Sequence, residues 1–319
     1  MDMNEITKEY KTIKGIYLMD QYSNGNIRDC VLNKRNIIKT KYGYLIPQYE
    51  DSGERRKCNI SLSFYNDGCL KSISLQEKTS IETNLGVFQA EYLTFYKTGN
   101  IKRLFPLNGK ITGYWSEEDE YKLAEKYDFN FSFGKFREKV IGISFYESGE
   151  AKSITLWPKD KVVLETPVGS AEVRIGFSMY SSGKIKSFEP FKPIELETPI
   201  GLIMAYDNQA IGIHADSNSL KFSESGKLEI LKTSLNEVEV VNKDGVKRIY
   251  KPQIRRSEID EMAIDIIPMK IEFNYNKVRF NNEEDEYNIS KCEFKISKFS
   301  LKAEKACTNC SSCSSCSGC

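Results

Sequence analysis

The sequence predicts an all-β protein in which tandem antiparallel β-hairpin repeats form an elongated or wrapped sheet, with one short helical insertion and a disordered C-terminal cysteine tail. Two pairs of similar segments support this fold. The segment ISLSFYNDGCLKSISL at 60–75 recurs as IGISFYESGEAKSITL at 141–156, and YLTFYKTGNIKRLFP around Gly99 recurs as GFSMYSSGKIKSFEP around Gly183. Between the members of each pair lies a second element, IETNLG, which returns as LETPVG and LETPIG. Such internal similarity is typical of repeat architectures.

Each repeat predicts a β-hairpin. Alternating residues such as Ile60, Leu62 and Phe64 place one face toward a core, and the glycine that follows supplies the positive φ of a tight turn. A second alternating run, which begins at Leu70, then returns, and the Thr-Pro-x-Gly element predicts a further turn. Weaker copies extend the predicted array over residues 10–232; they lie around Gly25, Gly43, Gly53 and Gly226.

The motif FYxxGxxKSIxL resembles the hairpin units of MORN-variant repeat proteins, which include the bacterial YwqK-type antitoxin proteins. The resemblance covers the repeat array. It implies a repeat scaffold with a binding function and gives no single residue a role. This chain differs from those shorter repeats because it pairs its hairpins into longer units and inserts Thr-Pro-x-Gly turns.

The first break in the array is the segment 107–129, in which residues 116–127 predict a short helix. Ser116 and Asp119 suit a helix cap, and the acidic run 117–120 suits the positive end of a helix dipole. In the alternative interpretation these carboxylates bind a cation or act as acid and base, although the run lacks the alternate ligand spacing of a calcium loop.

The second break, residues 205–222, contains His214, the single histidine of the chain. Asp216 follows two positions later, and Asp207, Asn218 and Ser219 are close in sequence. These short polar side chains suit a ligand site, a metal site or a positioned base, and they equally suit an ordinary turn. His214 and Asp216 are therefore candidate catalytic residues, with a structural turn as the alternative.

The repeat pattern fades after residue 232, and residues 233–303 predict a C-terminal β cap over the last repeat. Alternating residues predict strands at 270–280 and at 292–301. The final segment, 304–319, predicts a flexible tail, because from residue 307 it holds only Cys, Ser, Thr, Asn and Gly and cannot bury enough apolar surface to fold.

Five cysteines of this tail stand at every third position: Cys307, Cys310, Cys313, Cys316 and Cys319. Thiolates at this spacing can chelate one soft ion, so the tail predicts a site for zinc, copper(I) or an iron–sulfur cluster, with Cys292 as a further donor. The alternatives are a redox thiol tail, a tail modified by a partner enzyme, and a segment without function.

Composition narrows the classes of function. The 46 Lys and Arg residues balance 45 Asp and Glu residues, so nothing indicates a nucleic-acid partner. We find no signal peptide and no apolar window long enough to cross a membrane, and an odd total of nine cysteines favours free thiols in a cytoplasmic protein. The sequence has no GxSxG elbow, phosphate-binding loop or GxGxxG motif. We therefore expect a non-enzymatic repeat scaffold with a protein partner on its surface and a metal-binding tail; an enzyme with a site around His214 is the alternative.

Overall fold

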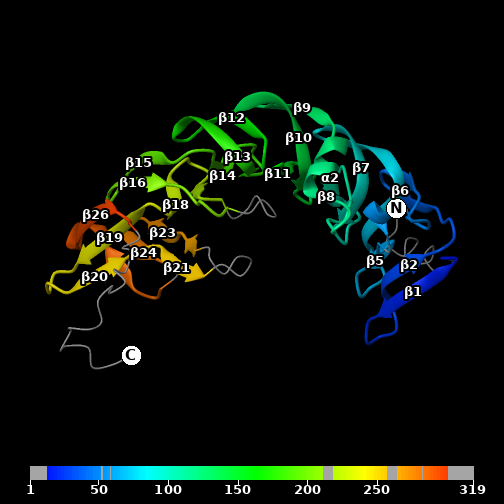
Figure 1. Ribbon diagram of the computed structural model, residues 1–319, viewed down its shortest axis with the longest axis horizontal. Helices are drawn as coiled ribbons and strands as arrows, with labels where there is room; N and C mark the ends of the chain where they lie inside the picture. Colours follow the sequence, from blue (N-terminus) through cyan, green and yellow to red (C-terminus); the bar gives the residue numbers. More distant parts are fainter. Residues whose placement is uncertain are drawn as a thin grey trace, which may run out of the picture.

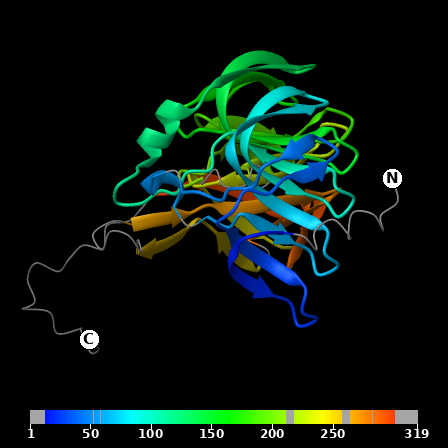
Figure 2. The ribbon, with the colours of Figure 1, turned by 90° about the vertical axis from the view of Figure 1, so that its right-hand side faces the viewer.

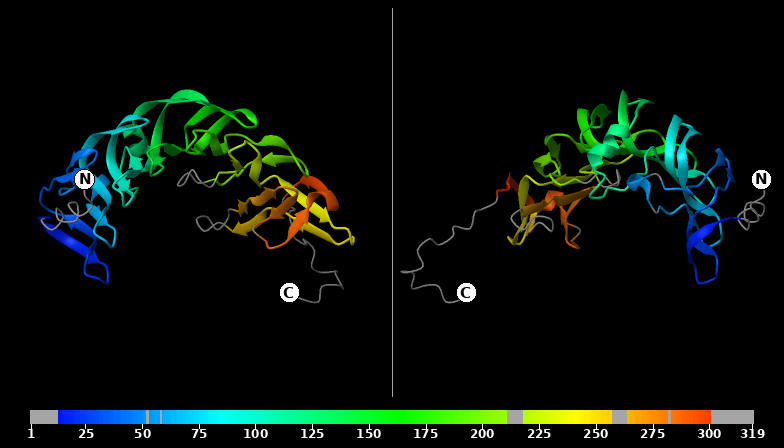
Figure 3. Two further views of the ribbon diagram at one scale, coloured as in Figure 1. Left: turned by 180° about the vertical axis from the view of Figure 1, so that it is seen from behind. Right: turned by 45° about the vertical axis from the view of Figure 1, so that its right-hand side comes forward.

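The computed structural model describes residues 13–51, 53–57, 59–210, 218–256, 264–281 and 283–300. These residues form an arch, with the N-terminal hairpins at one foot and the C-terminal strands at the other (Figure 1). Figure 3 shows the same arch from behind and from an oblique side. Antiparallel hairpins run through the whole arch, which confirms the predicted all-β hairpin array.

The arch is built on one continuous antiparallel sheet, which we call the spine. Each of its strands pairs with the next strand along the arch. In spatial order the strands are β1 (Ile16–Gln21), β2 (Ile27–Leu32), β5 (Leu62–Phe64), β6 (Leu70–Thr83), β7 (Gly86–Phe95), β8 (Ile101–Phe105), β10 (Gly134–Phe145), β11 (Ala151–Leu156), β13 (Gly169–Met179), β14 (Ile185–Pro190), β17 (Leu220–Phe222), β18 (Leu228–Thr233), β23 (Met269–Asn274), β24 (Lys277–Phe280) and β25 (Glu286–Asn288).

A second hairpin follows each of the first five spine hairpins and ends in a turn of its own. These second hairpins comprise β3 (Ile38–Thr40) with β4 (Gly43–Leu45), the far ends of β6 and β7, β9 (Lys126–Phe131) with the start of β10, β12 (Lys161–Thr166) with the start of β13, and β15 (Ile194–Thr198) with β16 (Gly201–Ala205). One structural repeat is therefore a spine hairpin plus a second hairpin. The similar segments at 60–75 and 141–156 lie two such repeats apart.

The C-terminal foot continues the spine and adds a small sheet beside it. That sheet contains β19 (Asn236–Val241), β20 (Lys247–Tyr250) and β26 (Glu293–Lys298), and a separate ladder joins β21 (Gln253–Arg256) to β22 (Ile264–Ile267). Short helical elements are η2 (Glu54–Arg56), α2 (Glu117–Leu123) and η3 (Ile289–Lys291). Seen along the arch, α2 projects from one flank (Figure 2).

Tyrosine hydroxyls join the first six spine hairpins, from β1–β2 to β17–β18. The first five of their turns have the sequence Tyr-x-x-Gly, and the tyrosine OH donates to the backbone carbonyl of the residue that precedes the turn of the next hairpin. The donor and acceptor pairs are Tyr22 with Phe64 (2.9 Å), Tyr65 with Phe95 (2.8 Å), Tyr96 with Phe145 (2.9 Å), Tyr146 with Met179 (2.8 Å) and Tyr180 with Phe222 (2.8 Å). This tyrosine ladder gives the array a bond between repeats that does not depend on strand pairing.

Four of the five second-hairpin turns, all except the turn of β9–β10, share one geometry, which the Thr-x-x-Gly pattern explains. In the turn that begins at Thr166, the threonine hydroxyl accepts from the backbone N of Val168 (3.2 Å) and donates to the carbonyl of Gly169 (2.7 Å). Gly169 has φ +97, a value that glycine adopts without steric cost. The same pair of bonds recurs at Thr40, Thr83 and Thr198, so proline at the second position is not required.

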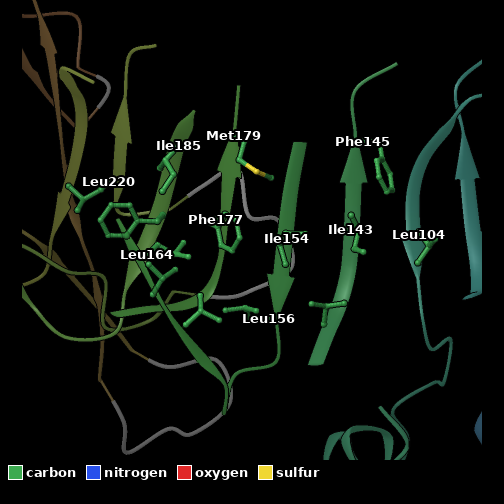
Figure 4. Close-up of a cluster of buried hydrophobic side chains, with 14 of the residues drawn as sticks. Leu104, Ile143, Phe145, Ile154, Leu156, Leu164, Phe177, Met179, Ile185 and Leu220 are labelled. Carbon is green, nitrogen blue, oxygen red and sulfur yellow. The ribbon is translucent and has the colours of Figure 1, made fainter. Parts of the chain in front are cut away.

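The core follows one row of cross-strand neighbours along the spine. Leu104 pairs with Ile143, Ile143 with Ile154, and Ile154 with Phe177, and all four are at most 1% exposed (Figure 4). Residues next to this row point to the opposite face because side chains alternate along a strand; there Ser144, Ser153 and Ser178 form a hydroxyl row. The apolar row is thus the continuous core of the arch.

Two sequence expectations differ from the structure. Gly53, expected to be the turn of a weaker repeat, instead precedes η2, because the residues that follow it, Glu54 to Arg56, offer no apolar alternation and the Arg56 side chain is drawn inward to Gln48 Oε1 (3.1 Å). The stretch 270–280, expected as one strand, is the hairpin β23–β24, which turns at Tyr275 with φ +52.

Candidate functional site

A buried polar cluster lies at the base of the segment 205–222 that the sequence singles out. Its centre is Glu189 on β14, which is 1% exposed. The Glu189 carboxylate accepts hydrogen bonds from the backbone N of Ser219 (2.7 Å) and from the Ser219 hydroxyl (2.9 Å). Both carboxylate oxygens are therefore engaged by the residue that precedes β17.

Burial raises the pKa of Glu189 to about 7, because its charged form has been withdrawn from water. The hydrogen bonds from Ser219 act in the opposite direction, and the carboxylate of Asp207 adds to the increase. The Arg174 guanidinium lowers the pKa only slightly, since its Nη2 lies 3.8 Å from Glu189 Oε1. Glu189 consequently changes its protonation near neutral pH, where an exposed glutamate would stay ionised.

Arg174 links the cluster to Asp207, near the start of the segment 205–222. Its Nε donates to the Pro190 carbonyl (3.1 Å), and its Nη2 donates to the Asp207 carbonyl (2.5 Å). The pairing register of β13 shifts directly after Arg174, and Ile175 has φ +65. A β-branched residue adopts such a φ at a cost of about 1–3 kcal/mol, so the bulge that positions Arg174 is held by the surrounding fold.

Hydroxyl and amide groups complete the cluster. The Ser178 and Ser187 hydroxyl oxygens lie 2.6 Å apart across β13 and β14, and Asn218 Nδ2 donates to Ser187 Oγ (3.0 Å). On the opposite side, the Asp207 carboxylate accepts from the backbone N of Gln209 (2.9 Å). The chain is therefore anchored to the spine on both sides of residues 211–217.

The cluster fixes the described residues on either side of 211–217. Ser219 places a hydroxyl beside a carboxylate with a pKa near 7, a pairing that general-base chemistry uses. Ser219 is 0% exposed and Glu189 is 1% exposed, so no substrate reaches this pair in the conformation described.

The structure brings together part of the site that the sequence predicts. Asp207, Asn218 and Ser219 gather near Glu189, whereas His214 and Asp216 lie outside the described residues. Sequence reasoning missed Glu189 and Arg174. One signal was present for Glu189: it stands six residues after its turn glycine, where the earlier hairpins have the uncharged residues Val31, Ser74, Phe105 and Thr155.

The predicted metal ligands Cys307, Cys310, Cys313, Cys316 and Cys319 also lie outside the described residues. Within the described ranges, no three His, Cys, Asp or Glu side chains are grouped so that they could hold a metal ion. Cys292, the further donor considered above, is a half-buried free thiol beside β26. Cys30 is buried, and burial raises the pKa of its thiol to about 11, which disfavours the thiolate that a metal needs.

The helical insertion has the structural role that its sequence favours. Ser116 and Asp119 form the predicted capping box at the start of α2. Glu120 is buried and accepts hydrogen bonds from Arg55 Nε (2.7 Å) and Trp115 Nε1 (2.7 Å), while Arg55 Nη2 also donates to Glu91 (2.7 Å). These bonds fasten the insertion to the array.

Among the helices of the described chain, none combines the length and the apolar character that crossing a bilayer requires. Comparison of the whole chain with protein-family models, with curated proteins and with solved structures finds no match.

Proposed function

We propose that this chain is a non-enzymatic scaffold that binds a protein partner along its hairpin array and binds a soft metal ion through its C-terminal cysteines. The observation that carries the scaffold role is the spine, in which equivalent positions recur along one continuous sheet from β1 to β25. Arrays of this kind present extended surfaces that suit large partners. The resemblance of the hairpins to MORN-variant repeats supports the same role.

The metal-binding part of the proposal is supported by the spacing of the five tail cysteines at 307–319. Two cysteines separated by two residues can reach adjacent positions around one tetrahedral ion, and four of the five would complete a site for zinc, copper(I) or an iron–sulfur cluster. Cys292 is a further donor that the folded chain can offer, since it is a free, half-buried thiol. Free thiols in an odd number also lead us to propose a reducing, cytoplasmic setting.

The test is metal analysis with an absorption spectrum on anaerobically purified protein. The intact chain is compared with a truncation that ends at Ala306 and with a full-length variant in which the five tail cysteines are serine. We expect bound metal or thiolate charge-transfer bands in the intact chain and their loss in both variants. Equal metal content in all three proteins would refute the tail site, and an intact mass that departs from the encoded one would instead support a modified tail.

A second candidate is an enzyme whose site includes the loop around His214. Glu189 favours this candidate, because a buried carboxylate with a pKa near 7 is often found at active sites. The test compares the metabolites of a cell extract before and after incubation with the intact protein, with His214→Ala and with the tail truncation. Turnover that His214→Ala abolishes and the truncation retains would establish an enzyme; the scaffold proposal expects no turnover from any of the three proteins.

A further inference from the structure

The same bulge interrupts consecutive spine hairpins. In β5–β6, Ser63 pairs with Ser72 and Phe64 pairs with Leu70, which leaves Lys71 outside the ladder. A bulge of this kind re-aims the side chain of its extra residue, and Lys71 is exposed between two buried neighbours. Equivalent register shifts leave one residue outside the ladder in the other hairpins: Arg28, Lys102, Lys152, Lys186 and Glu229.

Four of the bulged residues form a row of lysines with regular spacing. They are Lys71 on β6, Lys102 on β8, Lys152 on β11 and Lys186 on β14, and we call them the lysine row. One strand separates each of these strands from the next in the spine. Neighbouring strands lie about 4.8 Å apart, so successive lysines are about 10 Å apart along the arch.

At both ends of the array, the charged residue at the bulged position forms ion pairs with neighbouring side chains. Arg28 pairs with Asp20 and with Asp29 (3.2 Å), and Glu229 pairs with Lys221 (2.8 Å). Between these ends, no carboxylate of the described chain forms an ion pair with Lys71, Lys102 or Lys186.

Ladder tyrosines lie beneath three members of the row. The Nζ atoms of Lys102 and Lys186 are each 5.6 Å from the ring centres of Tyr96 and Tyr180, and Lys152 Nζ is 6.0 Å from the ring centre of Tyr146. An aromatic face attracts an ammonium group without cancelling its charge. The rings therefore hold these lysines in a line, and they leave the charges of Lys102 and Lys186 available to a ligand.

We propose that the lysine row binds an extended acidic polypeptide segment whose carboxylates recur at about every third residue. In the polyproline II form of an extended peptide, which has three residues per turn and advances about 3.1 Å per residue, every third side chain lies on the same side at a spacing of about 9 Å, close to the spacing of the row. Each ammonium group is a compact charge with three donors, which suits a single carboxylate. The proposal rests on the proposed scaffold role and names the chemistry of its partner.

The spacing favours a polypeptide over a nucleic acid. Phosphates follow each other about every 3.4 Å along one DNA strand, so a row with a spacing of about 10 Å would leave most of them without a partner. The net charge of the chain is +1, so the protein has no overall field that would gather a polyanion. The row acts through local contacts.

The test measures fluorescence anisotropy of a labelled peptide with four glutamates, one at every third residue, against the full-length protein at low salt. A second peptide has the same composition with its glutamates in one block. The lysine-row variant carries Lys71→Gln, Lys102→Gln, Lys152→Gln and Lys186→Gln. A control variant has the same change in net charge at exposed lysines elsewhere and carries Lys34→Gln, Lys39→Gln, Lys135→Gln and Lys243→Gln.

We expect the spaced peptide to bind more tightly than the blocked one, with a loss of about two- to fivefold for each lysine of the row that is replaced. The control variant should keep the affinity of the unmodified protein, and added salt should weaken binding. Circular dichroism of both variants checks that the fold is intact.

Equal binding of the two peptides, or an equal loss in both variants, would overturn the proposal. Tighter binding of a single-stranded oligonucleotide through the same lysines would overturn it in favour of nucleic acid. If a native partner binds the lysine-row variant as well as it binds the unmodified protein, the row is refuted while the scaffold role stands.

Discussion

Replacing Tyr65 by phenylalanine removes one hydroxyl from the tyrosine ladder and keeps the aromatic ring. The lost bond is the 2.8 Å hydrogen bond from Tyr65 OH to the Phe95 carbonyl, which joins β5–β6 to β7–β8. A protein hydrogen bond contributes about 0.5–1.5 kcal/mol net, so we expect the free energy of unfolding to fall by about 1 kcal/mol. The contact of Lys97 with the Tyr65 ring should survive, because phenylalanine offers the same face.

The assay is equilibrium unfolding in urea. A loss of about 1 kcal/mol, divided by a slope of about 3 kcal/mol per M for a chain of this size, shifts the midpoint down by about 0.3 M at an unchanged slope. The matched control is Tyr44→Phe, because Tyr44 is 71% exposed and its change should stay within about 0.5 kcal/mol of zero.

A double variant extends the same test. Tyr180 lies several hairpins away from Tyr65 and donates to the Phe222 carbonyl at 2.8 Å. The effects of Tyr65→Phe and Tyr180→Phe should therefore add to about 2 kcal/mol. Repeat arrays sometimes unfold in parts, and in that case hydrogen exchange of β7 amides reports the local loss. A midpoint for Tyr65→Phe that equals the midpoint for Tyr44→Phe would show that the ladder hydroxyl contributes nothing.

Three further outcomes follow from the buried groups. Folding raises the pKa of Glu189 from 4.5 to about 7, so the native state holds a proton that the unfolded chain releases; stability should fall as pH rises between these values. Urea midpoints at about pH 5 and about pH 8 should differ less in Glu189→Gln than in the unmodified protein, and an equal difference would exclude Glu189 as the source. Arg55→Met leaves two buried carboxylates without their partner and should cost about 3–5 kcal/mol, whereas Lys57→Met removes an exposed pair and should cost under about 1 kcal/mol; similar losses would contradict this ranking. Ile154→Ala in the apolar row should lower the free energy of unfolding by about 2–5 kcal/mol, and Val163→Ala at an exposed position by far less. Equal losses in the two variants would show that the row is not the core.

The hairpins and their turns could be predicted from the sequence because their determinants are local. The alternation before Gly68 and the positive φ that Gly68 adopts lie within a few residues of one another. The start of the helix α2 could be predicted for the same reason, since Ser116 and Asp119 cap it from within. Its end was predicted wrongly: the helix stops at Leu123 and β9 begins at Lys126, whereas the sequence predicts a helix up to residue 127.

The packing positions of the second hairpins could not be predicted, because they depend on contacts between residues far apart in the chain. Lys41, in the turn of the hairpin β3–β4, donates to Asn100 Oδ1 at 2.9 Å, and the Tyr42 hydroxyl accepts from the backbone N of Ile101 at 2.9 Å. That hairpin thus passes over β5–β6 and rests on β7–β8. The same limit applies to Glu189, which meets Ser219 only once β14 has paired with β17.

The bulged position differs from the other repeated positions because the fold does not determine its residue. The turn glycine is set by its φ, the tyrosine by the ladder and the apolar row by packing, whereas Lys71 lies outside both ladder and core. Common descent of the repeats alone does not explain the lysines, because the position directly after each turn glycine has diverged to Asn26, Cys69, Asn100, Glu150, Lys184 and Lys227.

Like charges about 10 Å apart repel each other by about 0.4 kcal/mol in water before screening. The ring contacts of Lys102 and Lys186 with Tyr96 and Tyr180 offset this repulsion, whereas Lys71 is exposed and contacts no aromatic ring of the described chain. The positive charge at Lys71 therefore brings the fold no benefit and is best explained by a ligand, and the spacing of the strands determines which acidic peptides fit the row.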